Sequence, residues 1–490
     1  MSAINTTISH TGIYAIGNVI RYMTSFVMLP IYTRYLTPAD YGVLELLSTI
    51  VDFVGILLGM RIGEAVFRYY VEQESSKQKN TVIMTAMVLV ALTFGFGVLV
   101  MVVLALPISE LVFGSADYMH YVQLFAVIML LQALAEVPLI LMRAQQRPWL
   151  FVSFSTLKLL LQVGFNIYFV VLLDLKVEGV IYSGLISSAI FAILLLVYVI
   201  STIGLVRPDY SLGRKMIGFS LPLMLSGLGA FYLTFGDRYF LRVYSDLSEI
   251  GIYALGYKFG FLLGYMIWVP FSNVWDTQKY HIHKQTDGKL VFQRTFLLLS
   301  FVTILLGLGM SLFVEDVLRV MSAPEFWPAS HIVPVIVVAY IVQMWTFYCS
   351  LGIYLRGNTM QMAYSTAIAS VAITVTYFLL IPPFGGMGAA VATLLAFLVR
   401  LIWVDWAARK HYDMELPWGR VLSILGVATA VYMAGSIWVP EHWLAALLWK
   451  SALCMAYVGL FLVMPIFTER QKKALLAFIK NPKKVGEIIG

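Results

Sequence analysis

Nine of the polar or charged side chains inside apolar segments long enough to cross a lipid bilayer are candidates for a functional site. They are Asn18, Arg21, Arg61, Glu64, Glu136, Lys158, Asp237, Arg238 and Lys258. A charge near the bilayer centre costs several kcal/mol, so such residues usually face a hydrated cavity or a partner of opposite charge. Cations that line a cavity favour an anionic cargo, because guanidinium groups bind phosphate through paired hydrogen bonds and lysine supplies a point charge.

The nine residues form two predicted groups with different chemistry. The predicted cargo-binding group contains Arg21, Arg61, Lys258, Asn18, Lys158 and Arg238. The predicted ion-coupling or gating group contains the carboxylates Glu64, Asp237 and Glu136. Arg21 and Lys258 have no opposite charge nearby in the sequence, which favours a hydrated cavity around them.

Two pairs among these residues also fit a purely structural interpretation. Arg61 and Glu64 are three residues apart, so they can pair along one helix. Asp237 and Arg238 can mark the outer end of the apolar segment 216–241. The sequence leaves both alternatives open.

The composition of the chain requires lipid as its solvent. Of the 490 residues, 60% are hydrophobic and 12% are charged, with a mean hydropathy of +0.86. Soluble domains carry roughly 25% charged residues. Unbroken apolar runs are typical of transmembrane helices and not of barrel strands, which alternate. We therefore predict an all-α polytopic membrane protein with fourteen transmembrane helices. Their approximate ranges are 11–32, 41–67, 82–106, 118–142, 149–173, 180–200, 216–241, 250–275, 292–314, 332–355, 362–381, 387–407, 421–439 and 443–467.

The basic residues predict how these helices are oriented. The loops after even-numbered spans and the C-terminal tail contain most of the 33 basic residues. The loops after odd-numbered spans contain only Arg34, Lys176, Arg242 and Arg319. By the positive-inside rule, both termini are cytoplasmic. The net charge of +7 then reflects topology, so we expect no nucleic-acid partner.

The loops and motifs argue against an enzyme. No connection between spans is long enough to form a separate catalytic domain. The sequence has no P-loop, nucleophile elbow or Gly-rich dinucleotide turn, and the pair His281 and His283 has no companion cysteines for a metal. Cys349 and Cys454 lie inside apolar runs, as small buried hydrophobic residues do. We therefore predict a transporter with no cofactor and no metal.

The sequence repeats itself weakly at an offset of 209 residues. DYGV at 40–43 opens span two and EIGI at 249–252 opens span eight, while Gly179 and Gly388 precede spans six and twelve. Because a six-span unit is even, two copies share one orientation and surround a central cavity. We predict an N-lobe at 1–206 with spans one to six and a C-lobe at 207–415 with spans seven to twelve. The remaining segment, 416–490, contains two further helices and a basic cytoplasmic tail.

Two segments resemble a known family. LPIYTRYLTPADYG at 29–42 resembles the N-terminal signature of bacterial polysaccharide exporters, and GIYALGYK at 251–258 is similar to a second part of it. These proteins are the O-antigen flippase-like members of the multidrug/oligosaccharidyl-lipid/polysaccharide exporter superfamily. The resemblance implies a MATE-like arrangement of two six-helix lobes. It also implies that cations on spans one, two and eight line the cavity, at Arg21, Arg61 and Lys258.

The function that this resemblance implies is flipping of an undecaprenyl-pyrophosphate-linked oligosaccharide to the periplasmic leaflet. The product would serve O-antigen, capsule or exopolysaccharide synthesis at the bacterial inner membrane, with H⁺ or Na⁺ coupling and a polysaccharide polymerase or other assembly proteins as partners. Two alternatives share the fold: a cation-coupled multidrug antiporter and a flippase for the peptidoglycan lipid precursor. A polymerase or ligase is disfavoured because every predicted outer loop is short.

Overall fold

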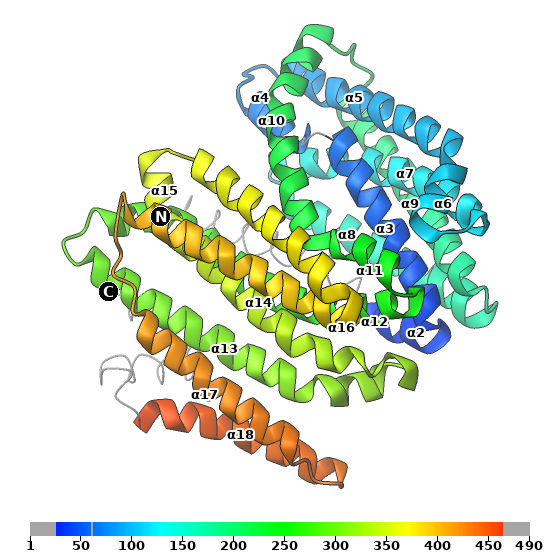
Figure 1. Cartoon of the computed structure of the whole chain (residues 1–490). Helices are drawn as coiled ribbons and strands as arrows, with labels where there is room; N and C mark the ends of the chain where they lie inside the picture. The colour runs from blue at the N-terminus through cyan, green and yellow to red at the C-terminus, as the bar shows by residue number, and fades with distance from the viewer. Residues whose placement is uncertain (1–25, 60–61, 464–490) are drawn as a thin grey trace. The chain divides into compact units, whose positions relative to one another are not determined.

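The computed structural model describes residues 26–59 and 62–463, and every regular element in these ranges is helical (Figure 1). Twelve helices in the described ranges are long and apolar enough to cross a membrane. A segment in hydrocarbon must satisfy its backbone polar groups internally, and an α-helix does this within a single segment. The predicted all-α, membrane-spanning fold class is therefore confirmed.

The count of fourteen spans remains a prediction. The first predicted span, 11–32, lies mostly outside the described residues, and α16 (Met360–Arg409) covers predicted spans eleven and twelve together. This 50-residue helix is kinked at Gly385, which has φ 54° and ψ −131° and follows two prolines. Glycine adopts a positive φ without the penalty that a side chain imposes. The kink divides α16 into two arms, each long enough to cross a bilayer.

The chain divides into two compact units. Unit 1 comprises Met1–Gly251 and Met321–Glu325, and unit 2 comprises Ile252–Val320 and Phe326–Gly490. The described helices of unit 1 are α2 (Leu29–Tyr35), α3 (Pro38–Gly59), α4 (Ile62–Val71), α5 (Ser76–Val103), α6 (Ala105–Phe113), α7 (Met119–Ala144), α8 (Pro148–Asn166), α9 (Lys176–Ile203), α10 (Tyr210–Phe235) and α11 (Asp237–Tyr244). α12 (Leu247–His283) begins in unit 1 and continues in unit 2. The other described α-helices of unit 2 are α13 (Gly288–Met321, with its last residue in unit 1), α14 (Ala329–Cys349), α15 (Leu351–Arg356), α16, α17 (Trp418–Ile437) and α18 (Trp443–Val463).

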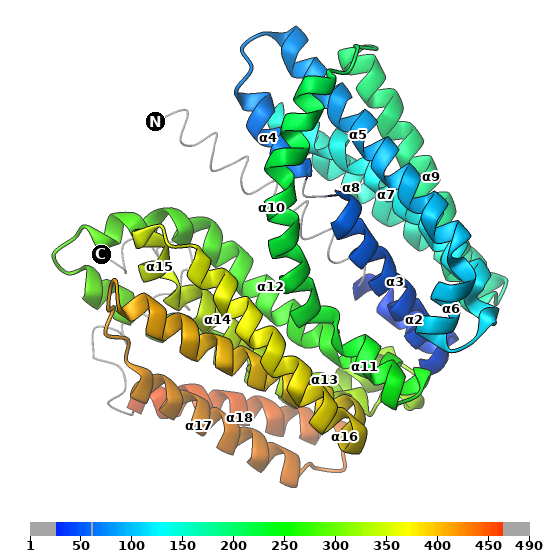
Figure 2. The same cartoon turned by 45° about the horizontal axis from the view of Figure 1, so that its top comes forward.

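In unit 1, α7 is the central helix. It packs against α3, α4, α5 and α9, and Figure 2 shows α5, α7 and α9 side by side. α5 begins at a hydrogen-bonded cap, where the Ser75 hydroxyl accepts from the Gln78 N–H. Its outer face exposes Leu92, Phe96 and Leu99. Large apolar side chains on an outer face are expected where lipid is the solvent.

α10 packs within unit 1 in this structure. Phe231 of α10 lies 5.8 Å from Phe53 of α3 between ring centroids, and Phe219 of α10 lies 6.4 Å from Tyr69 of α4. At its start, the Asp209 N–H donates to the Thr85 hydroxyl on α5. The predicted lobe limits placed this helix at the start of the second lobe, and those limits remain a prediction.

In unit 2, α14 packs against both α12 and α16. α12 approaches α14 through small residues: a Cβ on Gly260 would lie 2.3 Å from Ile336 Cγ2, and one on Gly264 would lie 2.8 Å from Tyr340 Cδ1. α14 in turn packs along α16, as Figures 1 and 2 show. Small residues let helix backbones approach closely where lipid provides no hydrophobic drive for association.

The glycines of the 209-residue repeat occupy equivalent places. A Cβ on Gly179 in unit 1 would lie 2.9 Å from the Phe169 carbonyl oxygen, and one on Gly388 in unit 2 would lie 2.1 Å from the Leu380 carbonyl oxygen. In each unit, the glycine therefore packs against the end of the preceding helix. The chain reverses there through a π-helical turn, Ile167–Leu172, in unit 1 and through the Gly385 kink in unit 2.

Candidate functional site

Three of the nine predicted site residues lie outside the described residues. They are Asn18, Arg21 and Arg61. The other six lie on five helices: Glu64 on α4, Glu136 on α7, Lys158 on α8, Asp237 and Arg238 on α11, and Lys258 on α12. The first five of these six belong to unit 1, and Lys258 belongs to unit 2.

Asp237 and Arg238 form a buried ion pair at the start of α11. Arg238 Nη1 donates to Asp237 Oδ1 at 2.5 Å and to the Thr234 carbonyl oxygen at 2.9 Å. The exposed fractions of the two residues are 0% and 2%. Buried charges of opposite sign compensate the loss of hydration for each other. This geometry agrees with the alternative that the pair is a structural feature at the outer end of span seven, while its roles in binding and gating stay predictions.

Arg242, which the sequence placed only in an outer loop, fixes the position of α11. Its guanidinium donates to the Phe113 carbonyl oxygen at the end of α6. The next residue, Gly114, has φ 68° and ends that helix in the left-handed conformation. A Cβ there would lie 2.7 Å from Arg242 Nη2, the tip of a flexible side chain, so the positive φ is the stronger reason for glycine.

Glu64 and Glu136 lie on helices that pack against each other. A Cβ on Gly63 of α4 would lie 3.0 Å from Ile140 Cδ1 of α7. Both carboxylate residues are exposed. One turn after Glu64, Arg68 pairs with Glu72 at 3.1 Å. This ion pair lies at the C-terminal end of α4. The ion-coupling role of Glu64 and Glu136 stays a prediction.

Lys158 contacts an aromatic ring. Its Nζ lies 5.3 Å from the centroid of the Phe191 ring on α9, and the residue is half-buried. Phe191 belongs to a buried apolar cluster that includes Phe151 and Leu195. A cation–π contact of this kind stabilises the ammonium group on the aromatic face.

Lys258 lies on the side of α12 that faces away from α14. The residues that pack on α14 are Gly256, Gly260 and Gly264, which follow one another at helical spacing. A position two residues from Gly256 and Gly260 points to the opposite face of the helix. Lys258 is half-buried there, so its ammonium group lies on a face that α14 does not cover.

A further charged pair joins α13 and α18, and the sequence analysis missed it. Lys450 donates to Asp316 at 2.5 Å, and the exposed fractions of the two side chains are 5% and 39%. Lys450 is the cation inside predicted span fourteen, and Asp316 follows predicted span nine. Because Asp316 lies outside the predicted spans and 134 positions away, a single sequence offers no signal for this partner.

The match to a protein family covers more than half of the chain. Residues 8–275 match the family described as polysaccharide biosynthesis protein. The chain is 20% identical over 465 residues to the "Probable low-salt glycan biosynthesis flippase Agl15" of Haloferax volcanii. That alignment covers 92% of this chain and 93% of the relative. The similarity therefore extends over the whole membrane domain and not over a single motif.

Two solved structures have the same fold. The lipid II flippase MurJ in an inward closed conformation superposes with a TM-score of 0.73 at 12% identity, covering 91% of this chain and 98% of MurJ. An inward-facing multidrug resistance MATE family transporter of the MOP superfamily superposes with a TM-score of 0.66 at 12% identity, covering 81% and 97%. These likenesses confirm the MATE-like fold, and the family match confirms the resemblance to polysaccharide exporters. The chain is a multi-pass membrane protein that belongs to the polysaccharide biosynthesis protein family.

Proposed function

We propose that this protein is a flippase that moves an undecaprenyl-pyrophosphate-linked oligosaccharide from the cytoplasmic to the periplasmic leaflet by alternating access. The product would serve the synthesis of a surface polysaccharide such as O-antigen, capsule or exopolysaccharide. The observation that carries this proposal is the alignment over 92% of the chain with a glycan biosynthesis flippase. The fold shared with a lipid II flippase supports the same class of cargo.

In this mechanism, cationic side chains offset the charge of the diphosphate. Arg21, Arg61 and Lys258 are the proposed contacts, and Asn18, Lys158 and Arg238 complete the proposed set. A diphosphate cannot enter hydrocarbon without compensation, because burying an unpaired charge is prohibitive. The half-buried Lys258, on the face of α12 that does not pack on α14, fits this role. The lipid tail remains in the bilayer while the sugar crosses in a hydrated cavity.

The carboxylates are proposed to couple transport to an H⁺ or Na⁺ gradient or to gate it. Glu64 and Glu136 are exposed, which fits exchange of a cation. Asp237 is buried against Arg238, so it would act by breaking and re-forming that pair. We further propose an inner-membrane location with both termini in the cytoplasm, from the distribution of Lys and Arg. A polymerase or other assembly protein would act on the flipped product.

The proposal is tested in cells that lack the protein. We expect undecaprenyl-pyrophosphate-linked oligosaccharide to accumulate while surface polysaccharide is lost, and a plasmid copy to reverse both effects. The doubly neutralised variant Arg21→Gln/Lys258→Gln should reach the membrane at a normal level without restoring export. Lys284→Gln is the matched control, because it removes an exposed cation outside the spans. Full export by the double variant would refute the proposed cation site.

A multidrug antiporter is the second candidate, because the fold is shared with a MATE family transporter. Such a protein would leave glycolipid pools unchanged and would alter tolerance to cationic drugs. A peptidoglycan precursor flippase is the third, on the likeness to MurJ. Loss of that activity would raise the lipid II pool and leave surface polysaccharide precursors unchanged, so one lipid extraction separates all three functions.

A further inference from the structure

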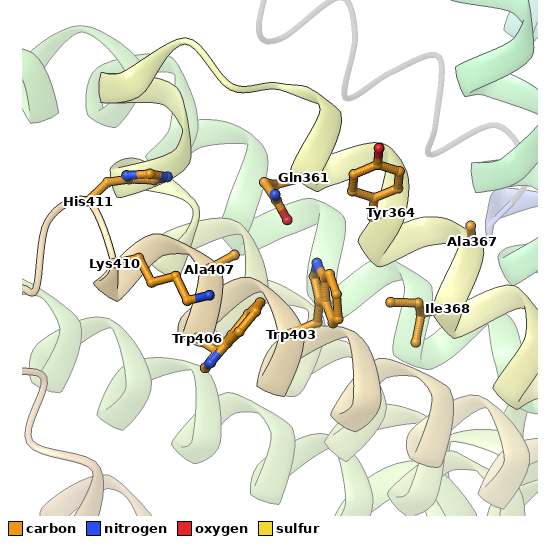
Figure 3. A pocket seen from close by; sticks show the side chains of 9 residues that line it. All are labelled: Gln361, Tyr364, Ala367, Ile368, Trp403, Trp406, Ala407, Lys410 and His411. Atoms are coloured by element: carbon orange, nitrogen blue, oxygen red, sulfur yellow. The ribbon is translucent and has the colours of Figure 1, made fainter.

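A pocket of about 440 Å³ lies in unit 2 between the start and the end of the kinked helix α16 (Figure 3). The Gly385 kink folds the helix back, so its first turns and last turns form the two walls. Tyr364 and Ile368 line the first wall, and Trp403, Trp406, Lys410 and His411 line the second. Ligand pockets typically measure about 300–1,000 Å³, so this volume fits a small headgroup with part of a chain.

The predicted topology places the pocket at the level of the lipid headgroups. α16 begins at Met360 and ends at Arg409, so both walls are at helix ends. The excess of Lys and Arg assigns this end of the predicted spans eleven and twelve to the cytoplasmic side. Tryptophan and tyrosine are enriched at that depth because their rings are apolar and their tips are polar.

The charges at the pocket are suited to an anion. Arg409 is already paired with Asp405 at 2.8 Å. Lys410 instead places its Nζ 3.3 Å from the centroid of the Trp406 ring, and among the described residues no carboxylate pairs with it. A lysine held on an aromatic face keeps its charge available to a phosphate group beside it.

Two polar atoms in the walls are also without a hydrogen-bond partner among the described residues. They are Gln361 Oε1, an acceptor, and Trp403 Nε1, a donor. Figure 3 shows Gln361 on the first arm across from Trp403 on the second. Both atoms are buried, so a headgroup hydroxyl reaches them only after the Gln361 and Trp403 side chains turn toward the pocket.

We propose that this pocket binds the headgroup of an anionic glycerophospholipid from the cytoplasmic leaflet. The phosphate lies beside Lys410 and His411, and the first methylene groups lie against Ile368 and Trp403. Basic pockets between transmembrane helices on the cytoplasmic side are known binding places for anionic lipid headgroups. The bound lipid joins the two ends of α16 and so stabilises the kinked helix.

The test is native mass spectrometry of the full-length purified protein in detergent with an equimolar mixture of dioleoyl phosphatidylglycerol and dioleoyl phosphatidylcholine. We expect the first bound lipid to be phosphatidylglycerol, with a preference that Lys410→Gln lowers about five-fold, the contribution of one lysine near an anionic headgroup. The matched control Lys284→Gln removes an exposed cation elsewhere on unit 2 and should keep the preference. Ile368→Trp fills the pocket while it keeps every charge, and it should reduce the binding of that first lipid.

Three results would overturn the proposal. The first is an unchanged preference in Lys410→Gln, and the second is an equal loss in Lys410→Gln and Lys284→Gln, which would indicate general surface charge. The third is displacement of the lipid by excess sn-glycerol 3-phosphate, which would make the site one for a soluble phosphate ester. Retention of phosphatidylglycerol against that competitor supports a lipid site.

Discussion

The tightest helix crossing in unit 1 depends on two glycines at equivalent positions of the repeat. A Cβ on Gly42 of α3 would lie 2.0 Å from the carbonyl oxygen of Leu247, and one on Gly251 of α12 would lie 2.0 Å from that of Pro38. Both pairs of residues are separated by 209 positions, so the contacts are reciprocal.

Alanine at either position must push the two backbones apart. Ordinary contact of a Cβ begins at 3.4 Å, and the obstructing atoms are backbone carbonyls that cannot rotate away. The helices therefore have to separate by about 1.4 Å at this point, which corresponds to overpacking that costs about 1–3 kcal/mol. Either substitution already opens most of the space that the other needs. The double variant should consequently be destabilised by less than the sum of the single variants.

The assay is thermal unfolding of the detergent-solubilised protein. The measured quantity is the fraction of protein that stays monodisperse after heating. Gly55→Ala is the matched control, because it lies on the same helix α3 with nothing within 4 Å of its Cβ position. Alanine there should be neutral or should stabilise the helix by up to ~1 kcal/mol. If Gly42→Ala and Gly251→Ala are as stable as Gly55→Ala, or if their effects add fully, the reasoning is wrong.

Three further predictions concern the charged residues. Asp316→Leu should destabilise the protein more than Lys450→Met, because it leaves a cation that is 5% exposed without its partner, at a cost of about 3 kcal/mol, whereas Asp316 is 39% exposed. The double variant should recover most of this loss in the same thermal assay. Asp237→Asn should likewise lower the unfolding temperature, because it leaves Arg238 buried beside a neutral amide, and an unchanged temperature would contradict the pairing. Lys258→Gln should lower surface-polysaccharide export about ten-fold, since a charge–phosphate contact contributes about 1.5–3 kcal/mol. Lys258→Arg keeps the charge and should retain export. Equal export by the two variants would exclude a role for the charge.

Hydropathy predicted which segments cross the membrane and missed where their helices end. Predicted span eight was 250–275, whereas α12 runs from Leu247 to His283. The apolar part of a helix marks its contact with hydrocarbon, while helical hydrogen bonding continues into the headgroup region and the water. In α16, the two predicted spans, 362–381 and 387–407, correspond to two helical arms that the non-helical Gly385 separates.

Contacts between distant segments were not predictable from one sequence. The Trp345 indole N–H donates to the Ser300 hydroxyl at 2.9 Å, and Lys450 pairs with Asp316 across 134 positions. An apolar run fixes neither the rotation of a helix about its axis nor the identity of its neighbours. The pocket at α16 was missed for the same reason. Its walls come from the two ends of α16, and the sequence does not show that these ends face each other.

The repeat places different charges at equivalent positions of its two copies. The 209-residue offset aligns Lys258 of α12 with Thr49 of α3. Glu45 and Asp52 lie four residues before and three residues after Thr49, on the same helix face, and Asp52 is exposed. The first copy therefore presents carboxylates where the second presents a cation. An anionic headgroup is attracted to the second face and repelled by the first, so in the proposed mechanism the diphosphate binds at Lys258, whereas α3 is suited to the coupling cation.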